Sequence, residues 1–256
     1  MKLFFRDLGN GKPLIIAHGL WGASDNWLPI AHLLENQFRV ILPDARNHGQ
    51  SPHSATMNYE AMSDDLIELI GDLHLSEKPS IVGHSMGGKI VMALLLKRPE
   101  IVDKAVIVDI APIAYSAKDG GQHNKVIHFM QTFNPADYDS WAGLREAIGQ
   151  HFHSERGRQL FLKNIRRTPQ GFQWKINYPV IATHFDEISG CPGSLPHATY
   201  DKEILFLKGE HSNLIPDLAC LQKQFPAARL LQIPRCGHWI HAEQPEMLAE
   251  AIRKHC

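Results

Sequence analysis

The sequence predicts an α/β protein with a mostly parallel central sheet, helices on both faces of the sheet and a helical insertion. Three observations predict this fold. Strand-like apolar runs alternate with helical patterns from residue 13 to residue 109, as in parallel sheets with right-handed crossovers. The strand pattern stops at about residue 117 and resumes at residue 203. One strand ends in Gly-x-Ser-x-Gly and is followed at once by a helical pattern. A chain of 256 residues can hold one such domain with an insertion.

The composition excludes several classes of protein. A net charge of -1 gives no basic field for nucleic acid. No apolar run approaches the roughly 20 residues that span a bilayer, and the N-terminal apolar stretch is too short for a signal peptide, so we expect a cytoplasmic protein. The sixteen histidines include no His-Glu-x-x-His spacing, and we expect neither a metal nor another cofactor. The four cysteines are widely spaced, and we expect most of them to be free thiols; they are Cys191, Cys220, Cys236 and Cys256.

The first half of the chain supplies the centre of the sheet. Residues 2–7 and 13–18 are predicted strands, separated by a Gly-Asn-Gly turn, and we expect them to form an antiparallel entry into the sheet. A helix to about residue 36 and a strand at 38–42 follow. The periodicity of residues 58–73 predicts a helix capped by Asn58. Strands at 80–84 and 104–109 then flank a helix at 89–97.

The second half of the chain contains the insertion and completes the sheet. Residues 120–132, 139–151 and 154–165 have helix-like patterns, 166–174 is a predicted turn, and no convincing strand occurs. Strands at 203–208 and 229–234 and helices at 214–225 and 245–254 complete the chain. Because the insertion comes after one strand and before another, we interpret it as a lid. The predicted domains are a core of residues 1–116 and 198–256 and a helical lid of residues 117–197.

Ser85, at the centre of Gly-His-Ser-Met-Gly, is the predicted nucleophile. A serine in a tight turn between a strand and a helix is held in a strained conformation that exposes its hydroxyl. Glycines two residues before and after it remove the Cβ atoms that would clash in the bend. The helix that follows presents unpaired backbone N–H groups, including that of Met86, to developing negative charge.

Two Gly-rich or polar loops follow the neighbouring strands. The loop His18-Gly-Leu-Trp-Gly has little side-chain bulk, and the backbone N–H of Leu20 is the predicted second oxyanion donor. The loop of residues 43–51 is unusually polar. We expect Asp44, Arg46 and Ser51 to bond one another and brace the neighbouring turns, rather than to act in catalysis.

His238 is the predicted general base. A serine hydroxyl needs a base within hydrogen-bonding reach and a carboxylate to orient that base. His238 lies in a Gly-His loop after the last predicted strand, which is the position of the histidine in folds that carry this serine motif. His84 and His241 are weaker candidates, since His241 should face the final helix and His84 should point away from the serine.

Four motifs occur in the order typical of α/β-hydrolase-fold esterases, namely His18-Gly-Leu-Trp-Gly22, Asp44-x-Arg-Asn-His-Gly-x-Ser51, Gly83-His-Ser-Met-Gly-Gly88 and Gly237-His-Trp239. Val-Asp-Ile-Ala-Pro after the nucleophile helix, Gln-Gly-Phe-Gln-Trp-Lys-Ile-Asn in the insertion and Gly-His-Trp-Ile-His-Ala near the end make the chain similar to the small bacterial YbfF-type acyl esterases. This resemblance implies an α/β-hydrolase fold and cofactor-free hydrolysis of short- to medium-chain acyl esters, with acyl-CoA thioesters as a further substrate class.

The acid of the triad has two candidates. The family most often has an aspartate after the strand that follows the lid, but this sequence has Ser212 where that aspartate is expected. Asp109 ends the strand beside the Ser85 strand, and Glu210 lies near the usual place. We favour Asp109, because an acid at a strand tip is held more rigidly than one in a loop.

Aromatic side chains are candidates for the substrate pocket. We expect Trp21, Trp239, Phe129 and Phe172 to contact a small-molecule acyl ester or thioester, although core packing explains each ring equally well. Competing functions are a cofactor-free haloperoxidase, a carbon–carbon bond hydrolase and a binding protein that has lost catalysis. The sequence does not fix the acyl-chain length, the leaving group or the oligomeric state.

Overall fold

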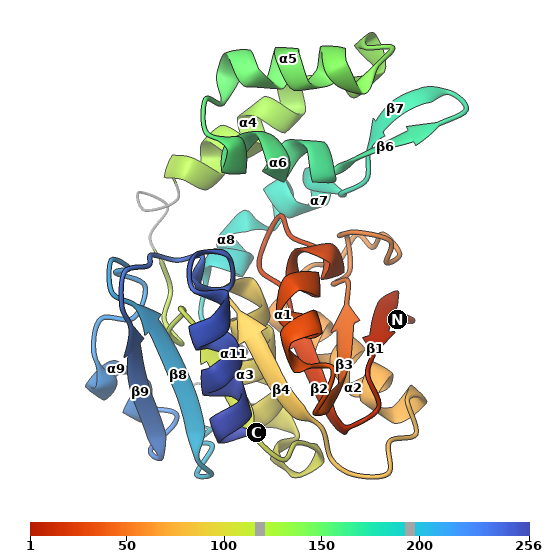
Figure 1. The fold of residues 1–256 in the computed structure, drawn as a ribbon. Coiled ribbons are helices and arrows are strands. Elements are labelled where there is room, and N and C mark those ends of the chain that lie inside the picture. Colours follow the sequence, from red (N-terminus) through yellow and green to blue (C-terminus); the bar gives the residue numbers. More distant parts are fainter. Residues whose placement is uncertain (116–120, 193–197) are drawn as a thin grey trace.

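The computed structural model describes residues 1–115, 121–192 and 198–256. Its core is a seven-stranded sheet with the order β1-β3-β2-β4-β5-β8-β9 (Figure 1). The strands are β1 (Phe5–Leu8), β2 (Lys12–Ala17), β3 (Phe38–Pro43), β4 (Ser80–His84), β5 (Ala105–Val108), β8 (Ile204–Gly209) and β9 (Ala228–Ile233). Every neighbouring pair is parallel except β1 and β3. The mostly parallel sheet predicted from the sequence is therefore confirmed.

Helices cover both faces of the sheet, and this explains why its strands are apolar throughout. Leu14 and Ile16 of β2 are buried in one cluster with side chains of α1 (Leu28–Leu34) and α11 (Pro245–His255). Ile15 and Ala17, on the opposite face, are buried in a second cluster with side chains of α2 (Tyr59–Asp72) and α3 (Met86–Lys97). Asn58 caps α2 as expected, with its side chain accepting from the N–H of Ala61. Two shorter helices are α9 (Leu218–Gln222) and α10 (Ile240–Glu243), and single 3₁₀ turns are formed by Ser24–Trp27, Pro99–Ile101 and Pro135–Asp137.

The insertion between β5 and β8 forms an upper layer that lies over the carboxyl ends of the strands (Figure 1). Its elements are α4 (Gly121–Thr132), α5 (Trp141–His151), α6 (Glu155–Lys163), β6 (Ile165–Thr168), β7 (Gly171–Trp174), α7 (Tyr178–Thr183) and α8 (Phe185–Ser189). The predicted domain boundaries, between residues 116 and 117 and between 197 and 198, fall in the segments outside the described residues.

Two expectations about strands are wrong. Only the first of the two N-terminal strands is antiparallel: β1 pairs with β3, whereas β2 pairs in parallel with both β3 and β4. The connection crosses the start of β3 so closely that a Cβ on Gly9 would lie 2.3 Å from the carbonyl oxygen of Phe38. The insertion also contains a strand pair, because β6 and β7 form a short antiparallel hairpin. Its two turn residues are followed by Gly171, the first residue of β7, whose φ of +108° is readily adopted only by glycine.

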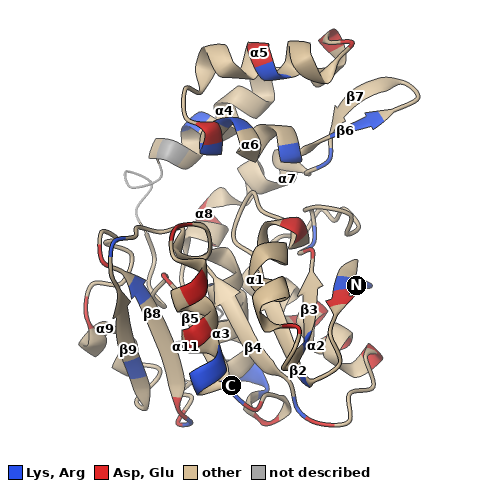
Figure 2. Ribbon diagram, in the orientation of Figure 1, with Lys and Arg blue, Asp and Glu red and all other residues tan. Residues whose placement is uncertain are grey.

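Charged residues of both signs are interspersed over the core and the insertion (Figure 2), in keeping with the small net charge. Among the helices of the described residues, none combines the length and the apolar character needed to cross a bilayer. In the same part of the chain, no group of three or more His, Cys, Asp or Glu side chains is arranged to hold a metal ion.

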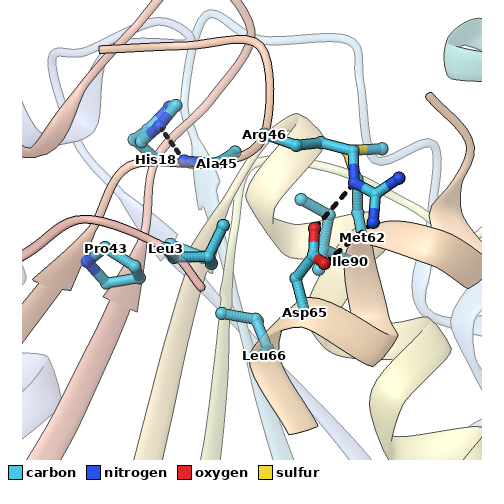
Figure 3. Close-up of a pocket in the computed structure, with 10 residues that line it drawn as sticks. Leu3, His18, Pro43, Ala45, Arg46, Met62, Asp65, Leu66 and Ile90 are labelled. Carbon is cyan, nitrogen blue, oxygen red and sulfur yellow. Dashed lines mark hydrogen bonds and ion pairs between the residues drawn. The ribbon is translucent and has the colours of Figure 1, made fainter. Parts of the chain in front are cut away.

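The polar loop after β3 bonds both within itself and to α2. The Ser51 hydroxyl donates to the backbone carbonyl of Asp44 over 2.6 Å, as expected for partners within the loop. Arg46 instead forms a buried two-point ion pair with Asp65 of α2, at 2.6 and 2.8 Å (Figure 3). The expectation that Arg46 bonds within its own loop is therefore wrong, because the guanidinium reaches across to the neighbouring helix.

Candidate active site

Ser85 occupies the sharp turn between β4 and α3. Its φ of 54° and ψ of -119° are a strained conformation for a residue with a side chain, costing on the order of 1–3 kcal/mol. A Cβ on Gly83 would lie 2.4 Å from the Gly87 carbonyl oxygen, and one on Gly87 would lie 2.2 Å from that of Ala17. Both glycines are therefore required for β4, α3 and β2 to meet this closely, and the turn holds Ser85 at the carboxyl end of the sheet.

A buried carboxylate orients the His238 ring. His238 lies in the loop between β9 and α10, and its Nδ1–H donates to Oδ2 of Asp109 over 2.9 Å. Asp109 directly follows β5 and is fully buried. Its Oδ1 accepts from the backbone N–H of Gly209 over 3.0 Å, and its Oδ2 also accepts from the Ser212 hydroxyl over 2.6 Å. With Nδ1 bonded to the carboxylate, Nε2 of His238 is the ring nitrogen available to a serine hydroxyl.

The other candidate acid, Glu210, lies elsewhere. Its Oε2 accepts from the backbone N–H of Arg235 over 2.6 Å, and the residue is exposed. Of the two carboxylates, the structure thus brings Asp109 to His238. Ser212, the serine found where an aspartate was expected, contacts the same carboxylate through its hydroxyl. The position of Ser212 in the sequence pointed to this residue, but only the structure shows which group its hydroxyl bonds.

His84 supports the backbone of the His238 loop. Its Nε2–H donates to the His238 carbonyl oxygen over 2.9 Å, and the two ring centroids are 4.6 Å apart. Burial, followed by the proximity of His238 and His241, holds the pKa of His84 well below its usual value. His84 therefore stays neutral and acts on the position of His238 rather than on Ser85.

Ser85 and His238 face a common cavity of about 290 Å³ between the sheet and the insertion. Most of its lining is apolar or aromatic. The core contributes Leu20, Trp21, Met86, Ile110, Leu214 and Trp239, and the insertion contributes Val126, Leu160, Phe185 and Ile188. The structure thus brings Trp21 and Trp239 to the cavity with both expected oxyanion donors.

Phe129 and Phe172 do not line this cavity. Phe129 stacks on Phe133, with ring centroids 4.7 Å apart, and is buried inside the insertion. Phe172 is buried against Trp141, with a centroid separation of 4.8 Å. We expected these two rings to contact substrate, but both pack in the core of the insertion. The faces of α4 and β7 that carry them turn into its interior.

The two expected oxyanion donors come from different elements. Met86 is the first residue of α3, so its backbone N–H has no partner within the helix. Leu20 lies in the loop between β2 and α1, and a Cβ on its neighbour Gly19 would lie 3.2 Å from the Ser85 Cβ. The Leu20 loop therefore passes directly beside the serine, as a second donor requires.

Lys89 also lines the cavity, one helical turn beyond Ser85. Its Nζ donates to the carbonyl oxygens of Ile113, over 2.9 Å, of Ser189, over 3.2 Å, and of Gly190, and lies 4.6 Å from the Tyr115 ring centroid. Burial lowers the pKa of Lys89 to about 7. Sequence analysis missed this residue, although a lysine inside an otherwise apolar helix was a signal. It ties the chain on both sides of the insertion to α3.

A strained serine at a strand–helix turn and an imidazole held by a buried carboxylate, over the carboxyl ends of a mostly parallel sheet, together define a hydrolase-type α/β enzyme. Residues 12–245 match the model of the α/β hydrolase fold family. The chain belongs to this family.

Two relatives and one solved structure agree with this assignment. The chain is 34% identical over 248 residues to esterase YbfF of Escherichia coli (strain K12), with 96% of this chain and 93% of that protein covered. It is 36% identical over 252 residues to the sn-1-specific diacylglycerol lipase ABHD11 of Danio rerio, with 94% of this chain and 77% of that protein covered. A solved structure of a marine microorganism esterase has a TM-score of 0.95 and 37% identity, and both chains are covered completely. The predicted resemblance to YbfF-type esterases is confirmed.

Proposed function

We propose that this chain is a serine esterase that cleaves short- to medium-chain acyl esters through Ser85, His238 and Asp109. The observation that carries the proposal is the 2.9 Å hydrogen bond between His238 and Asp109 at the cavity that contains Ser85. The similarity to proteins named esterase and diacylglycerol lipase supports an ester as the substrate.

The reaction starts with attack of the Ser85 hydroxyl on the acyl carbon, while Nε2 of His238 takes the hydroxyl proton. Asp109 holds the ring in the required tautomer and stabilises the imidazolium. The backbone N–H groups of Leu20 and Met86 bind the oxyanion, and each such donor contributes roughly 3–4 kcal/mol in comparable enzymes. The imidazolium then protonates the leaving alcohol, and water activated by the same ring hydrolyses the acyl-enzyme.

The insertion acts as a lid over the acyl group. Val126, Leu160 and Phe185 lie on its lower surface and complete the apolar side of the cavity. An acyl chain bound there leaves water, as the hydrophobic effect requires.

The test combines nitrophenyl ester hydrolysis with covalent labelling. A fluorophosphonate should modify Ser85, identified by mass spectrometry of the labelled peptide, and hydrolysis should depend on acyl-chain length. Ser85→Ala should abolish both signals, whereas Ser76→Ala, a change in an exposed turn, should leave both unchanged. Labelling at another serine, or hydrolysis by Ser85→Ala at more than about a tenth of the wild-type rate, would contradict the proposal.

A thioester of an anionic thiol, such as an acyl-CoA, is a second candidate substrate. A cavity of about 130 Å³ lies beside the catalytic cavity, and the two share the lining residues Leu20, Trp21, Leu160 and Trp239. Arg156 and Lys163 of α6 line the second cavity, which has no acidic side chain in its lining. Glu243, which does not line the cavity, pairs with Arg156 over 2.8 Å. The two cations and this one carboxylate leave a net positive charge, which favours a negatively charged leaving group in this space.

An acyl-CoA and a neutral thioester with the same acyl group separate the two substrate classes. Replacing both Arg156 and Lys163 with alanine should raise KM for the acyl-CoA at least tenfold and leave the neutral thioester unchanged. Arg166→Ala, which removes an exposed cation that does not line the cavity, is the matched control. Equal effects on both substrates would show that Arg156 and Lys163 support the packing of α6 and do not bind the leaving group.

A further inference from the structure

We propose, on the basis of the esterase activity proposed above, that the insertion fixes the oxyanion hole through Asn164. Asn164 is then a positioning residue: it touches no reacting atom and acts on the peptide group that carries the Leu20 N–H through one intervening peptide group, that between Trp21 and Gly22. The site would thus be complete only with the insertion in contact with the core.

The loop that carries Leu20 is a strained turn. The backbone N–H of Gly22 donates to the carbonyl of Gly19 over 3.0 Å, which closes a four-residue turn with Leu20 and Trp21 at its centre. Trp21 has a φ of +66°. A positive φ at the third position of such a turn usually requires glycine or asparagine. A tryptophan is held there only if contacts outside the turn stabilise it.

The insertion provides contacts at both ends of Trp21. Asn164, at the C-terminal end of α6, donates from Nδ2 to the Trp21 carbonyl over 2.8 Å, in a buried hydrogen bond. The same amide donates to the Leu160 carbonyl over 2.8 Å, and two carbonyl partners fix which end of the amide carries nitrogen. At the other end, the Trp21 indole Nε1–H donates to Nδ1 of His123 in α4 over 3.0 Å.

These hydrogen bonds form a continuous chain that ends at the candidate oxyanion donor. In a trans peptide the C=O and N–H groups point in opposite directions. The peptide between Trp21 and Gly22 accepts from Asn164 on one side and donates to the Gly19 carbonyl on the other. The Gly19 carbonyl belongs to the same peptide group as the Leu20 N–H. The Leu20 N–H therefore points away from Gly22, and its orientation depends on the bond made by Asn164.

A second donor reinforces the same peptide group. His18 donates from Nδ1 to the Gly19 carbonyl over 2.8 Å, while its Nε2 accepts from the Ala45 N–H over 3.0 Å (Figure 3). Two donors on one carbonyl hold the peptide plane and polarise its N–H. Asn164 supplies the part of this arrangement that comes from the insertion, and His18 the part that comes from the core.

The test is Asn164→Ala, with Asn177→Ala as the matched control. Asn177 also belongs to the insertion and also bonds the core through its side-chain amide, over 2.9 Å to Oδ1 of Asn47, but it is not part of the Trp21 turn. Asn164→Ala should lower kcat for nitrophenyl esters by roughly 10- to 100-fold, a part of the loss on deleting a whole oxyanion donor, with KM changed less than threefold. Asn177→Ala should keep kcat within twofold of wild type.

Affinity for an alkyl boronic acid provides a readout that loss of stability does not imitate. Its tetrahedral anionic adduct with serine occupies the oxyanion hole, whereas the carboxylic acid product binds as a planar ligand. Asn164→Ala should weaken boronate binding by the same factor as kcat and leave product binding unchanged. If Asn164→Ala does not fold, Asn164→Asp, which keeps the size of the side chain but places an oxygen against the Trp21 carbonyl, should show the same pattern.

Three results would overturn the inference. These are an unchanged kcat and boronate affinity in a folded Asn164 variant, equal losses in the Asn164 and Asn177 variants, or parallel losses of boronate and product binding. Wild-type protein that neither hydrolyses esters nor reacts with a fluorophosphonate would refute the proposed esterase function itself, which is a distinguishable outcome.

Discussion

Replacing Asp109 with asparagine tests the candidate triad at its most specific contact. The carboxylate accepts from Gly209 N–H on Oδ1, and from the Ser212 hydroxyl and His238 Nδ1–H on Oδ2. An asparagine must keep its oxygen against the Gly209 N–H, because the reverse orientation buries two donors facing each other at a cost of roughly 1–3 kcal/mol. Its NH₂ group then faces the imidazole.

That orientation sets the size of the effect. The Ser212 hydroxyl can rotate to accept from the new NH₂ group, but Nδ1 of His238 can accept only by losing its proton. The ring proton then moves to Nε2, which can no longer take a proton from Ser85. We expect kcat to fall on the order of 10⁴-fold, which corresponds to about 5 kcal/mol of transition-state stabilisation. KM should change little, because Asp109 is fully buried and does not line the cavity.

The assay is steady-state hydrolysis of nitrophenyl esters, with circular dichroism and thermal unfolding as checks on the fold. Glu210→Gln is the matched control, because this exposed carboxylate bonds only a loop N–H and its replacement should keep kcat within about threefold. A folded Asp109→Asn variant with more than about a tenth of wild-type kcat would refute the reasoning. A large loss in Glu210→Gln would instead transfer the role of the acid.

Three further predictions concern other parts of the molecule. Ser85→Ala and His238→Ala should each remove nearly all activity, and the double variant should be hardly slower than either, since residues that act as a unit are non-additive; multiplicative losses would argue against a shared mechanism. Val126→Phe, which adds bulk to the cavity, should reduce the ratio of kcat/KM for long over short acyl chains by about tenfold or more. Phe172→Ala should leave that ratio unchanged and instead lower the free energy of unfolding by roughly 3–5 kcal/mol. The opposite pattern would assign Phe172 to the pocket. Burial lowers the pKa of His241 to about 4, so between pH 6.5 and 4 the unfolded state binds a proton at this ring that the folded state does not, and the contribution of His241 to stability falls as the pH falls, by about 3 kcal/mol. Urea unfolding at a series of pH values gives the number of protons taken up on unfolding. His241→Phe should lower that number by about one between pH 6.5 and 4, and an unchanged number would show that this ring does not titrate as described.

The sequence alone determined the features that rest on neighbouring residues. The strand, the Gly-x-Ser-x-Gly turn and the helix around Ser85 are consecutive, so their local geometry follows from the backbone requirements of the residues themselves. The parallel sheet also followed from the alternation of strand and helix, since short right-handed connections permit few other arrangements. These predictions needed no knowledge of distant contacts.

Tertiary structure decided what depends on strand order and on the rotation of helices. The sequence left Asp109 and Glu210 as alternatives, and the choice required β5 to lie between β4 and β8, which places Asp109 within reach of His238 and Ser212. The antiparallel pairing of β1 with β3 joins residues 32 to 38 positions apart, such as Leu8 with Val40 and Phe5 with Pro43, and was equally invisible in the local pattern.

The insertion was the least predictable part. Phe129 and Val126 lie on the same helix, yet one packs inside the insertion and the other lines the cavity. A hydrophobic pattern reveals that a side chain is buried, but not which of two apolar surroundings buries it. The contact of Asn164 with Trp21 joins residues 143 positions apart. A polar residue that satisfies a distant carbonyl leaves no trace in its own neighbourhood of the sequence, because the free energy of that bond depends only on where the folded chain places its partner.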